Sequence, residues 1–177
     1  MDIKAFKMDG LGNDFVIIDR REEDVSLSKE QIIKIGDRNN VGFDQIIFIE
    51  KKINDVFPIK IFNPDGIEVG ACGNGSRCIA YLILKENNQR FIKLKAEKKI
   101  LEAEILSEKN VKINMGFPKF NEWYDIPLEN EKLNPKMLEL DFLKNEFGKG
   151  FCVNVGNPHI IFFVDNNENF EIEKIGP

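Results

Sequence analysis

Stretches of alternating apolar and polar residues, and short apolar runs rich in β-branched residues, recur along this chain, and both are typical of β-strands. Residues 3–8, which alternate roughly, and 15–19, which are dense in β-branched residues, predict two strands that form a β-hairpin. Ser28 and Gln31 are suited to the start of a short helix that ends at Gly36. The same two patterns predict further strands at residues 46–49, 57–62, 91–95, 100–106, 110–115, 150–155 and 160–164.

The spacing becomes helical in the middle of the chain. Ile79, Leu82 and Ile83 repeat three and four positions apart, which predicts a helix over residues 74–87. This helix is apolar on much of its surface, as expected of a helix that other elements surround. An Asn-Pro-Asp-Gly turn at residues 63–66 precedes it.

Cys72 lies at the expected start of this helix, directly before Gly73-Asn74-Gly75. The first amides of a helix have no partner within the helix, and the helix dipole favours negative charge there. Such a position lowers the pKa of a thiol, and the same amides can hold a carboxylate. We therefore expect a nucleophile or base beside an anion-binding site. The alternative is that Cys72 is a small apolar residue buried in a tight turn.

The composition narrows the classes of function. The chain has 177 residues and a net charge of −5, so a nucleic-acid partner gains no support. No apolar run approaches the ~20 residues that a membrane span needs, and no secretory signal is visible. Three cysteines, an odd number, are not the pattern of a disulfide scaffold. We expect a cytoplasmic protein with no membrane or nucleic-acid partner.

Several polar residues lie at loops and strand ends, where ligands are commonly bound. Asn13 is in the hairpin loop, Gln45 and Asn63 flank predicted strands, and His159 is the only histidine. His159 follows Asn-Pro in a predicted turn, which leaves it free to meet a ligand. Turn and cap chemistry is the favoured explanation of Gln45 and Asn63 when they are taken alone. A lone histidine near a strand end is more often structural than catalytic.

A metal site would need the cysteines and the histidine together. Cys72 and Cys78 are separated by five residues, and Cys152 and His159 by six, which does not match zinc-ligand spacings. We expect no metal ion, with Cys78 and Cys152 as core residues.

The alternation breaks after residue 116. Prolines and Trp123-Tyr124 interrupt it, and acidic residues crowd positions 129–146. This change predicts a domain at residues 1–116, followed at 117–177 by a connector and the start of a second domain.

Three separated motifs resemble those of the diaminopimelate epimerases. Residues 7–15, Lys-Met-Asp-Gly-Leu-Gly-Asn-Asp-Phe, are similar to the N-terminal signature of that family. Residues 62–69 and 71–78, the latter Ala-Cys-Gly-Asn-Gly-Ser-Arg-Cys, are similar to its catalytic-thiol motif. Residues 155–159, Val-Gly-Asn-Pro-His, are similar to its third block. The resemblance extends over the whole chain.

The resemblance implies both a fold and a reaction. The fold is α+β, with a twisted antiparallel sheet curled around the helix at 74–87 and a second, similar domain only partly present. The reaction is an isomerase's interconversion of LL- and meso-diaminopimelate, without pyridoxal phosphate or another cofactor, in lysine and peptidoglycan precursor biosynthesis. Two cysteines lie on opposite sides of the substrate α-carbon, one as a thiolate base and one as a thiol acid.

The resemblance also assigns roles to residues. Cys72 matches the first catalytic cysteine, and Gly73 and Asn74 match backbone amides around the reacting carboxylate. His159 matches a residue close to that cysteine. Further substrate-binding positions match Asn13, Gln45, Asn63 and Asn157.

One departure from the family pattern limits this expectation. Family members carry a second Cys-Gly-rich motif and a Glu-Arg pair that holds a substrate carboxylate, and neither occurs in these 177 residues. We expect a front portion of the enzyme that cannot epimerise alone, and a homodimer is compatible with it. Two alternatives stay open: a related isomerase, such as a proline racemase or a phenazine-synthesis isomerase, and a non-catalytic amino-acid-binding or interaction module.

Overall fold

The computed structural model describes residues 3–97, 99–108, 110–120, 137–139, 147–156 and 158–164. The chain divides into two units, Met1–Gly116 (the first unit) and Phe117–Pro177 (the second unit). None of the helices in these described ranges is long and apolar enough to cross a bilayer.

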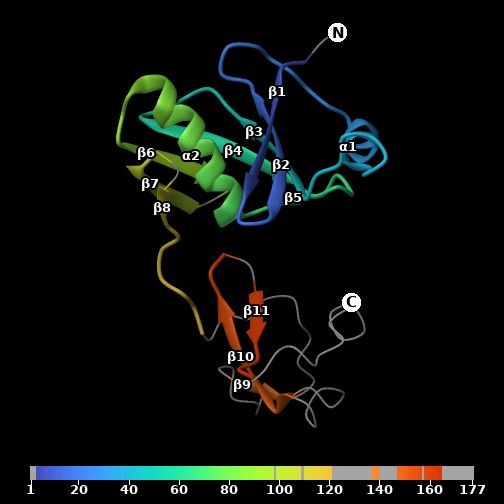
Figure 1. Cartoon of the computed structure of the whole chain (residues 1–177), viewed down its shortest axis with the longest axis vertical. Coiled ribbons are helices and arrows are strands. Elements are labelled where there is room, and N and C mark those ends of the chain that lie inside the picture. The colour runs from blue at the N-terminus through green and yellow to red at the C-terminus, as the bar shows by residue number, and fades with distance from the viewer. Residues whose placement is uncertain are drawn as a thin grey trace. The chain divides into compact units, whose positions relative to one another are not determined.

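The first unit is built on one curled sheet with helix α2 (Gly73–Asn87) lying across it (Figure 1). The ladders between β2 and β3 and between β4 and β6 are parallel, and the other ladders are antiparallel. The sheet is therefore mixed and not antiparallel throughout. Its strand order is β1 (Ala5–Gly10), β2 (Asn13–Asp19), β3 (Gln45–Ile49), β4 (Val56–Phe62), β6 (Phe91–Ala96), β7 (Lys99–Ser107) and β8 (Asn110–Asn114), and β5 (Glu68–Val69) pairs with β4 beside this path.

The predicted strands of the first unit are all present, with ends shifted by no more than two residues. The short β5 was not predicted, because two residues are too few to show an alternation. The parallel ladders were not predicted either, because alternation marks a strand without naming its partner.

Both helices have defined ends. Helix α1 (Lys29–Gly36) begins with a capping box, in which the Ser28 hydroxyl accepts from the Gln31 amide and the Gln31 side chain accepts from the Ser28 amide. Helix α2 ends at Asn88, which adopts the left-handed conformation that favours asparagine and glycine. The helix start predicted at Ser28 is confirmed.

The main core lies between α2 and the concave face of the sheet. Helix α2 contacts β1, β2, β3, β6, β7 and β8. Its residues Ile79 and Ile83 are fully buried, as are Phe15 and Ile47 on the strands beneath them. This arrangement confirms the α+β class and the surrounded helix.

A smaller core lies on the other face of the sheet, where Phe43, Ile46 and Phe48 pack with Ile32 of α1. Strands β2 and β3 are therefore covered on both faces, which explains why residues 15–18 and 46–49 are apolar without interruption.

The second unit contains a three-stranded antiparallel sheet in the order β11 (Pro158–Ile161), β10 (Lys149–Asn154), β9 (Met137–Glu139). Strand β9 lies in the segment where the sequence pattern predicts no strand. Cys152 is buried in β10, as expected.

Candidate active site

Cys72 occupies the position that the sequence predicts, at the start of helix α2. It is the N-cap residue in an extended conformation, and its Sγ accepts a hydrogen bond from the Gly75 amide at 3.2 Å. The carbonyl of Cys72 accepts from the Ser76 amide at 2.9 Å. A half-buried sulfur therefore lies against amides that have no partner within the helix.

The electrostatics of this sulfur differ from the sequence prediction. Burial raises the pKa of the Cys72 thiol, and the amides of Gly75 and Asn74 oppose that rise by donating toward the sulfur. The expectation of a lowered pKa is therefore wrong for this structure. At this position the desolvation of a thiolate is more unfavourable in free energy than two amide hydrogen bonds are favourable.

Asn13 and Asn74 connect the β1–β2 hairpin loop to the start of α2. The Asn74 Nδ2 donates to the Asn13 Oδ1 at 2.6 Å, although the two residues are 61 positions apart. On the other side, the Asn13 Nδ2 donates to Asp44 Oδ2 at 3.1 Å. Arg77 donates to Asn74 Oδ1. Two predicted ligand-binding residues thus form one hydrogen-bonded chain beside Cys72.

Gln45 and Asn63 form a second polar pair, with the Gln45 Nε2 donating to Asn63 Oδ1 at 3.2 Å. The register explains why this pair lies at the same end of the sheet as Asn13. Gln45 is opposite Phe15 in the parallel β2–β3 ladder, and Ile46 is opposite Phe62 in the antiparallel β3–β4 ladder. The start of β2, the start of β3 and the end of β4 therefore lie side by side.

The start of α2 lies against the same end of the sheet. A Cβ built on Gly75 would be 2.4 Å from Ile47 Cδ1 and 3.4 Å from Phe15 Cε1. Six of the eight predicted site residues therefore gather at one end of the first unit. They are Cys72, Gly73, Asn74, Asn13, Gln45 and Asn63.

The other two predicted residues belong to the second unit. Asn157 lies outside the described residues. His159 lies in strand β11, opposite Val153, and not in the predicted turn. The part that Asn157 and His159 take in binding stays a prediction.

Cys78 is a core residue, as predicted. It is 5% exposed and belongs to the main core between α2 and the sheet. Burial raises the pKa of its thiol to about 11. Within the described ranges no group of three or more His, Cys, Asp or Glu side chains is arranged to hold a metal ion.

Sequence reasoning missed the charged residues that support this site. Asp14 and Asp44 lie directly beside the predicted residues Asn13 and Gln45, and Arg38 contacts both carboxylates. The two carboxylates lie next to predicted ligand-binding residues in the sequence, which indicates that they need a cationic partner. Only the structure identifies Arg38 as that partner.

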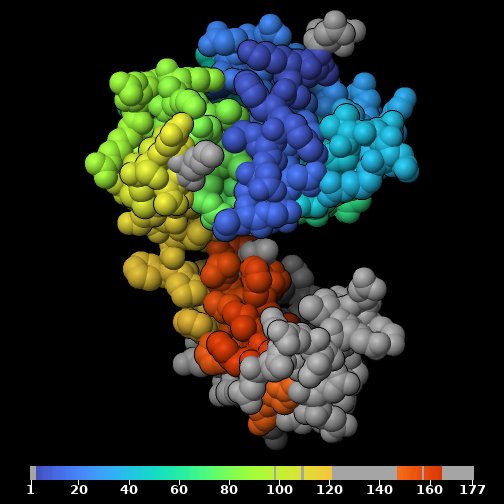
Figure 2. Space-filling model, viewed as in Figure 1, coloured from blue at the N-terminus to red at the C-terminus, as the bar shows by residue number. Residues whose placement is uncertain are grey.

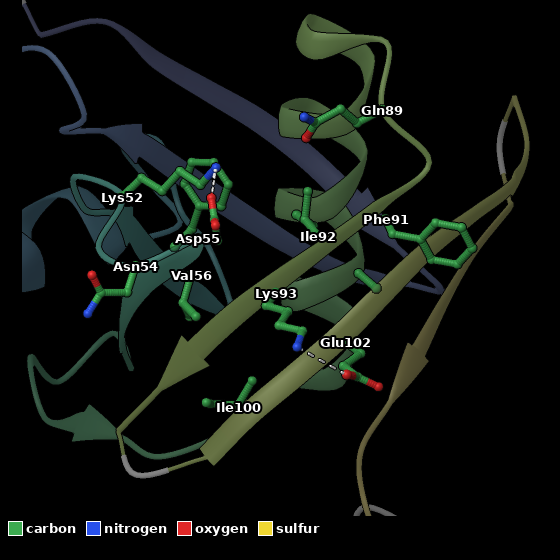
Figure 3. Close-up of a pocket in the computed structure, with 12 residues that line it drawn as sticks. Lys52, Asn54, Asp55, Val56, Gln89, Phe91, Ile92, Lys93, Ile100 and Glu102 are labelled. Carbon is green, nitrogen blue, oxygen red and sulfur yellow. Dashed lines mark ion pairs between the residues drawn. The ribbon is translucent and has the colours of Figure 1, made fainter.

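Two hollows of similar size lie elsewhere on the first unit. One, of about 510 Å³, borders the hairpin and α2 and is lined by Leu11, Arg77 and Tyr81 among others. The other, of about 540 Å³, is lined by residues of β6 and β7 and by residues 52 and 54–57, before and at the start of β4, among others (Figure 3). None of the predicted site residues lines it, and its charges pair internally, including Lys93 with Glu102 at 3.7 Å.

The fold of this chain is shared with solved structures of other proteins. A solved structure of a predicted epimerase from Pseudomonas aeruginosa matches with a TM-score of 0.64 at 13% identity, covering 99% of this chain and 67% of that one. A phenazine biosynthesis protein of the PhzF family from Enterococcus faecalis matches with a TM-score of 0.56 at 12% identity, covering 85% and 54%. At these identities the likeness establishes a shared fold.

The sequence then identifies the family. The profile of the family described as diaminopimelate epimerase matches residues 5–121. A diaminopimelate epimerase from Pelagibacter ubique is 48% identical over 180 residues, which cover all of this chain and 65% of that protein. The chain belongs to the diaminopimelate epimerase family, and the resemblance drawn from its three motifs is confirmed. It spans slightly less than two thirds of that relative's length.

Proposed function

We propose that these 177 residues carry the first acid–base group of a diaminopimelate epimerase, an isomerase that acts without pyridoxal phosphate or a metal. The observation that supports this most directly is the Cys72 Sγ beside the Gly75 amide, at the end of the sheet where Asn13, Gln45 and Asn63 gather. Family membership supports the substrate, diaminopimelate, and a place in cytoplasmic lysine and peptidoglycan precursor synthesis.

The proposed reaction moves two protons, one off the α-carbon and one onto it, and no net electrons. The Cys72 thiolate takes the α-proton, and the C–H electron pair stays on the substrate as a carbanion delocalised into the α-carboxylate. Amides of Gly73 and Asn74, as the family resemblance implies, neutralise that carboxylate and stabilise the developing charge. A second thiol on the opposite side of the α-carbon returns a proton and becomes the thiolate, which inverts the centre.

The raised pKa of Cys72 requires that something help to form the thiolate. The bound substrate supplies a candidate, because its α-ammonium is one bond from the reacting carbon and would come close to a sulfur that takes the α-proton. A nearby cation lowers a thiol pKa. We infer that Cys72 is mainly a thiol in the free protein and ionises as the amino acid binds. When a second thiol is present, the apparent pKa values belong to the pair.

The second thiol is not expected from within these residues. Cys78 lies in the core with its pKa raised to about 11, and Cys152 is buried in β10. Neither lies at a glycine-rich helix start like that of Cys72. We infer that the 177-residue chain alone does not complete the two-base reaction.

Two measurements on this chain test the proposal. Iodoacetamide labelling followed by peptide mapping should modify Cys72 faster than Cys78, and Cys78→Ala should leave the labelling of Cys72 unchanged as the matched control. Labelling of Cys78 or Cys152 first, with Cys72 inert, would count against the assignment. Incubation with each diaminopimelate stereoisomer in D₂O, followed by NMR, should show no epimerisation. Turnover of both stereoisomers at the rate of an epimerase with two catalytic cysteines would refute the inference that this chain alone does not complete the reaction.

One observation favours a second function, a non-catalytic amino-acid-binding module. A thiol whose pKa is raised is mostly protonated near neutral pH, so little of the thiolate base is present, and the polar cluster around it could bind an amino acid without reacting. Binding of diaminopimelate to the 177-residue chain that is unaffected by Cys72→Ser, with no exchange of the substrate α-proton in D₂O, would favour that function over catalysis by Cys72.

A further inference from the structure

A network of charged side chains supports the hairpin loop that carries Asn13. Arg38 follows α1, and its guanidinium donates to Asp14 Oδ2 at 2.7 Å through one nitrogen and to Asp44 Oδ1 at 2.6 Å through the other. Lys7 also donates to Asp14, at 2.6 Å. Figure 2 shows the hairpin, in dark blue, against the segment of α1 and its following loop, in lighter blue to cyan.

The backbone amides of Asp14 and Asp44 take part in this network as well. The Asp14 amide donates to Asp44 Oδ2 at 3.0 Å, and the Asp44 amide donates to Asp14 Oδ1 at 3.1 Å. Asp44 Oδ2 also accepts from the Asn13 Nδ2. One carboxylate, fixed by Arg38, thus holds both the backbone and the side-chain amide of the hairpin.

These contacts determine which way two amides point. Because a carboxylate only accepts, the Asn13 side chain must turn its Nδ2 toward Asp44 and its Oδ1 toward Asn74. Because a guanidinium only donates, Arg77 requires the Asn74 Oδ1, which leaves the Asn74 Nδ2 for Asn13. The chain of hydrogen bonds therefore has one direction, from Arg77 to Asp44.

We propose that Arg38 and Asp44 are positioning residues, which orient Asn13 and, through it, hold Asn74 and the first turn of α2 in place around Cys72. The proposal rests on the function proposed above, since it concerns the thiol of that reaction. Asn13 is exposed and follows a two-residue turn, Leu11-Gly12, in which both residues have positive φ. An exposed side chain on such a turn loses its rotamer freedom only if its partners are themselves fixed.

The first turn of α2 is the point at which the network reaches the sulfur. The Gly75 amide, directly after Asn74, donates to Cys72 Sγ at 3.2 Å. The side chain of Asn74 is held by Asn13. Loosening Arg38 should therefore weaken the contact of this first turn with the sulfur, without removing any group that touches the sulfur.

The experiment compares Arg38→Gln with Arg90→Gln in the 177-residue chain. Arg90 is a matched control: it pairs with one carboxylate, Glu104, at 2.8 Å, and its side chain is 66% exposed against 60% for Arg38. The measurements are the rate of Cys72 alkylation by iodoacetamide across pH, hydrogen exchange of the Asn13 and Asn74 side-chain amides by NMR, and thermal stability. None of them uses the substrate, so they are independent of whether the chain acts on diaminopimelate.

We expect Arg38→Gln to move the alkylation profile of Cys72 to higher pH and to slow the reaction near pH 8 roughly three- to tenfold, the range for weakening a charge-assisted hydrogen bond. The amide protons of Asn13 and Asn74 should exchange faster in the same variant. Arg90→Gln should change neither. Arg38→Lys keeps the positive charge but loses the planar guanidinium whose two nitrogens bind two carboxylates. It should therefore restore the alkylation profile only in part.

A purely structural role predicts a different result. Arg38→Gln would then lower the thermal stability as Arg90→Gln does, while the alkylation profile and the amide exchange stayed those of the unmodified chain, and this would overturn the proposal. Full restoration by Arg38→Lys would also overturn it, because the effect would then come from charge alone. If Arg38→Gln does not fold, Arg38→Lys decides, since the proposal requires an intermediate profile and faster amide exchange.

Discussion

Gly75 is the position where the packing of α2 against the sheet can be tested most sharply. A Cβ at this residue would lie 2.4 Å from Ile47 Cδ1 and 3.3 Å from Cys72 Sγ. Ile47 is fully buried and packs with Phe15, which is fully buried as well. Carbon atoms in contact lie about 3.5–4.0 Å apart, so Ile47 or the helix start must move by roughly 1 Å or more.

The matched control is Gly73, two residues earlier in the same helical turn. The nearest atom to a Cβ there is Met115 Sδ at 3.4 Å, an ordinary contact. Replacing glycine with alanine inside a helix gains up to about 1 kcal/mol, and this gain is similar at both sites. Overpacking a full core costs about 1–3 kcal/mol. We therefore expect Gly75→Ala to be about 1–3 kcal/mol less stable than Gly73→Ala.

Urea unfolding followed by circular dichroism at the helix band measures this difference directly. Iodoacetamide labelling of the same variants shows whether the sulfur moves with the helix start, and Gly75→Ala should change the labelling rate of Cys72 more than Gly73→Ala does. Equal stabilities would refute the reasoning, since they would mean that Ile47 yields at no cost and that α2 is not seated on the sheet at Gly75.

Three further predictions concern single side chains. Ser28→Ala removes the capping box of α1 and should lower the unfolding free energy by about 1 kcal/mol, whereas Ser28→Asp should retain most of it. The buried Ser76 hydroxyl has no hydrogen-bond partner among the described residues, so Ser76→Ala should raise the thermal stability, and a loss would show that the hydroxyl has a partner. The hydrogen bond from Arg38, helped by Lys7, holds the pKa of Asp14 well below its usual range. This contribution to stability is complete above the unfolded-state pKa, about 3.9, and is lost as the pH falls below it. Asp14→Asn should therefore lower stability at pH 7 and flatten its decline below about pH 4, as measured by urea unfolding at each pH.

The elements of the fold could be predicted because each has a local cause. The Ser28–Gln31 pair, the alternating strands and the apolar surface of α2 all act over a few residues. Pairing between distant strands has no such local signal. The parallel contact of β2 with β3 depends on the register that places Phe15 opposite Gln45, and no feature of either strand alone determines that register.

The candidate site shows the same division between local and distant causes. The position of Cys72 at a helix start followed from the glycines around it, and the structure places it there. Arg38 was not predicted, because its two carboxylate partners come from different segments, the start of β2 and the residue before β3, 24 and 6 positions away. Charged networks of this kind depend on which loops the fold brings together.

The pKa of Cys72 shows where reasoning from the helix start alone fails. That reasoning counted the amides that favour a thiolate and left out the water that the same site removes. In the folded chain the sulfur is half buried, and desolvation outweighs the Gly75 and Asn74 amides. Under the function proposed above, a fixed set of donors around a neutral thiol suits a base that ionises only when its substrate is present. The donors would already be in place, so the charge of a bound ammonium would need to supply only the remaining difference, and a thiolate absent from the free protein would not be exposed to oxidation.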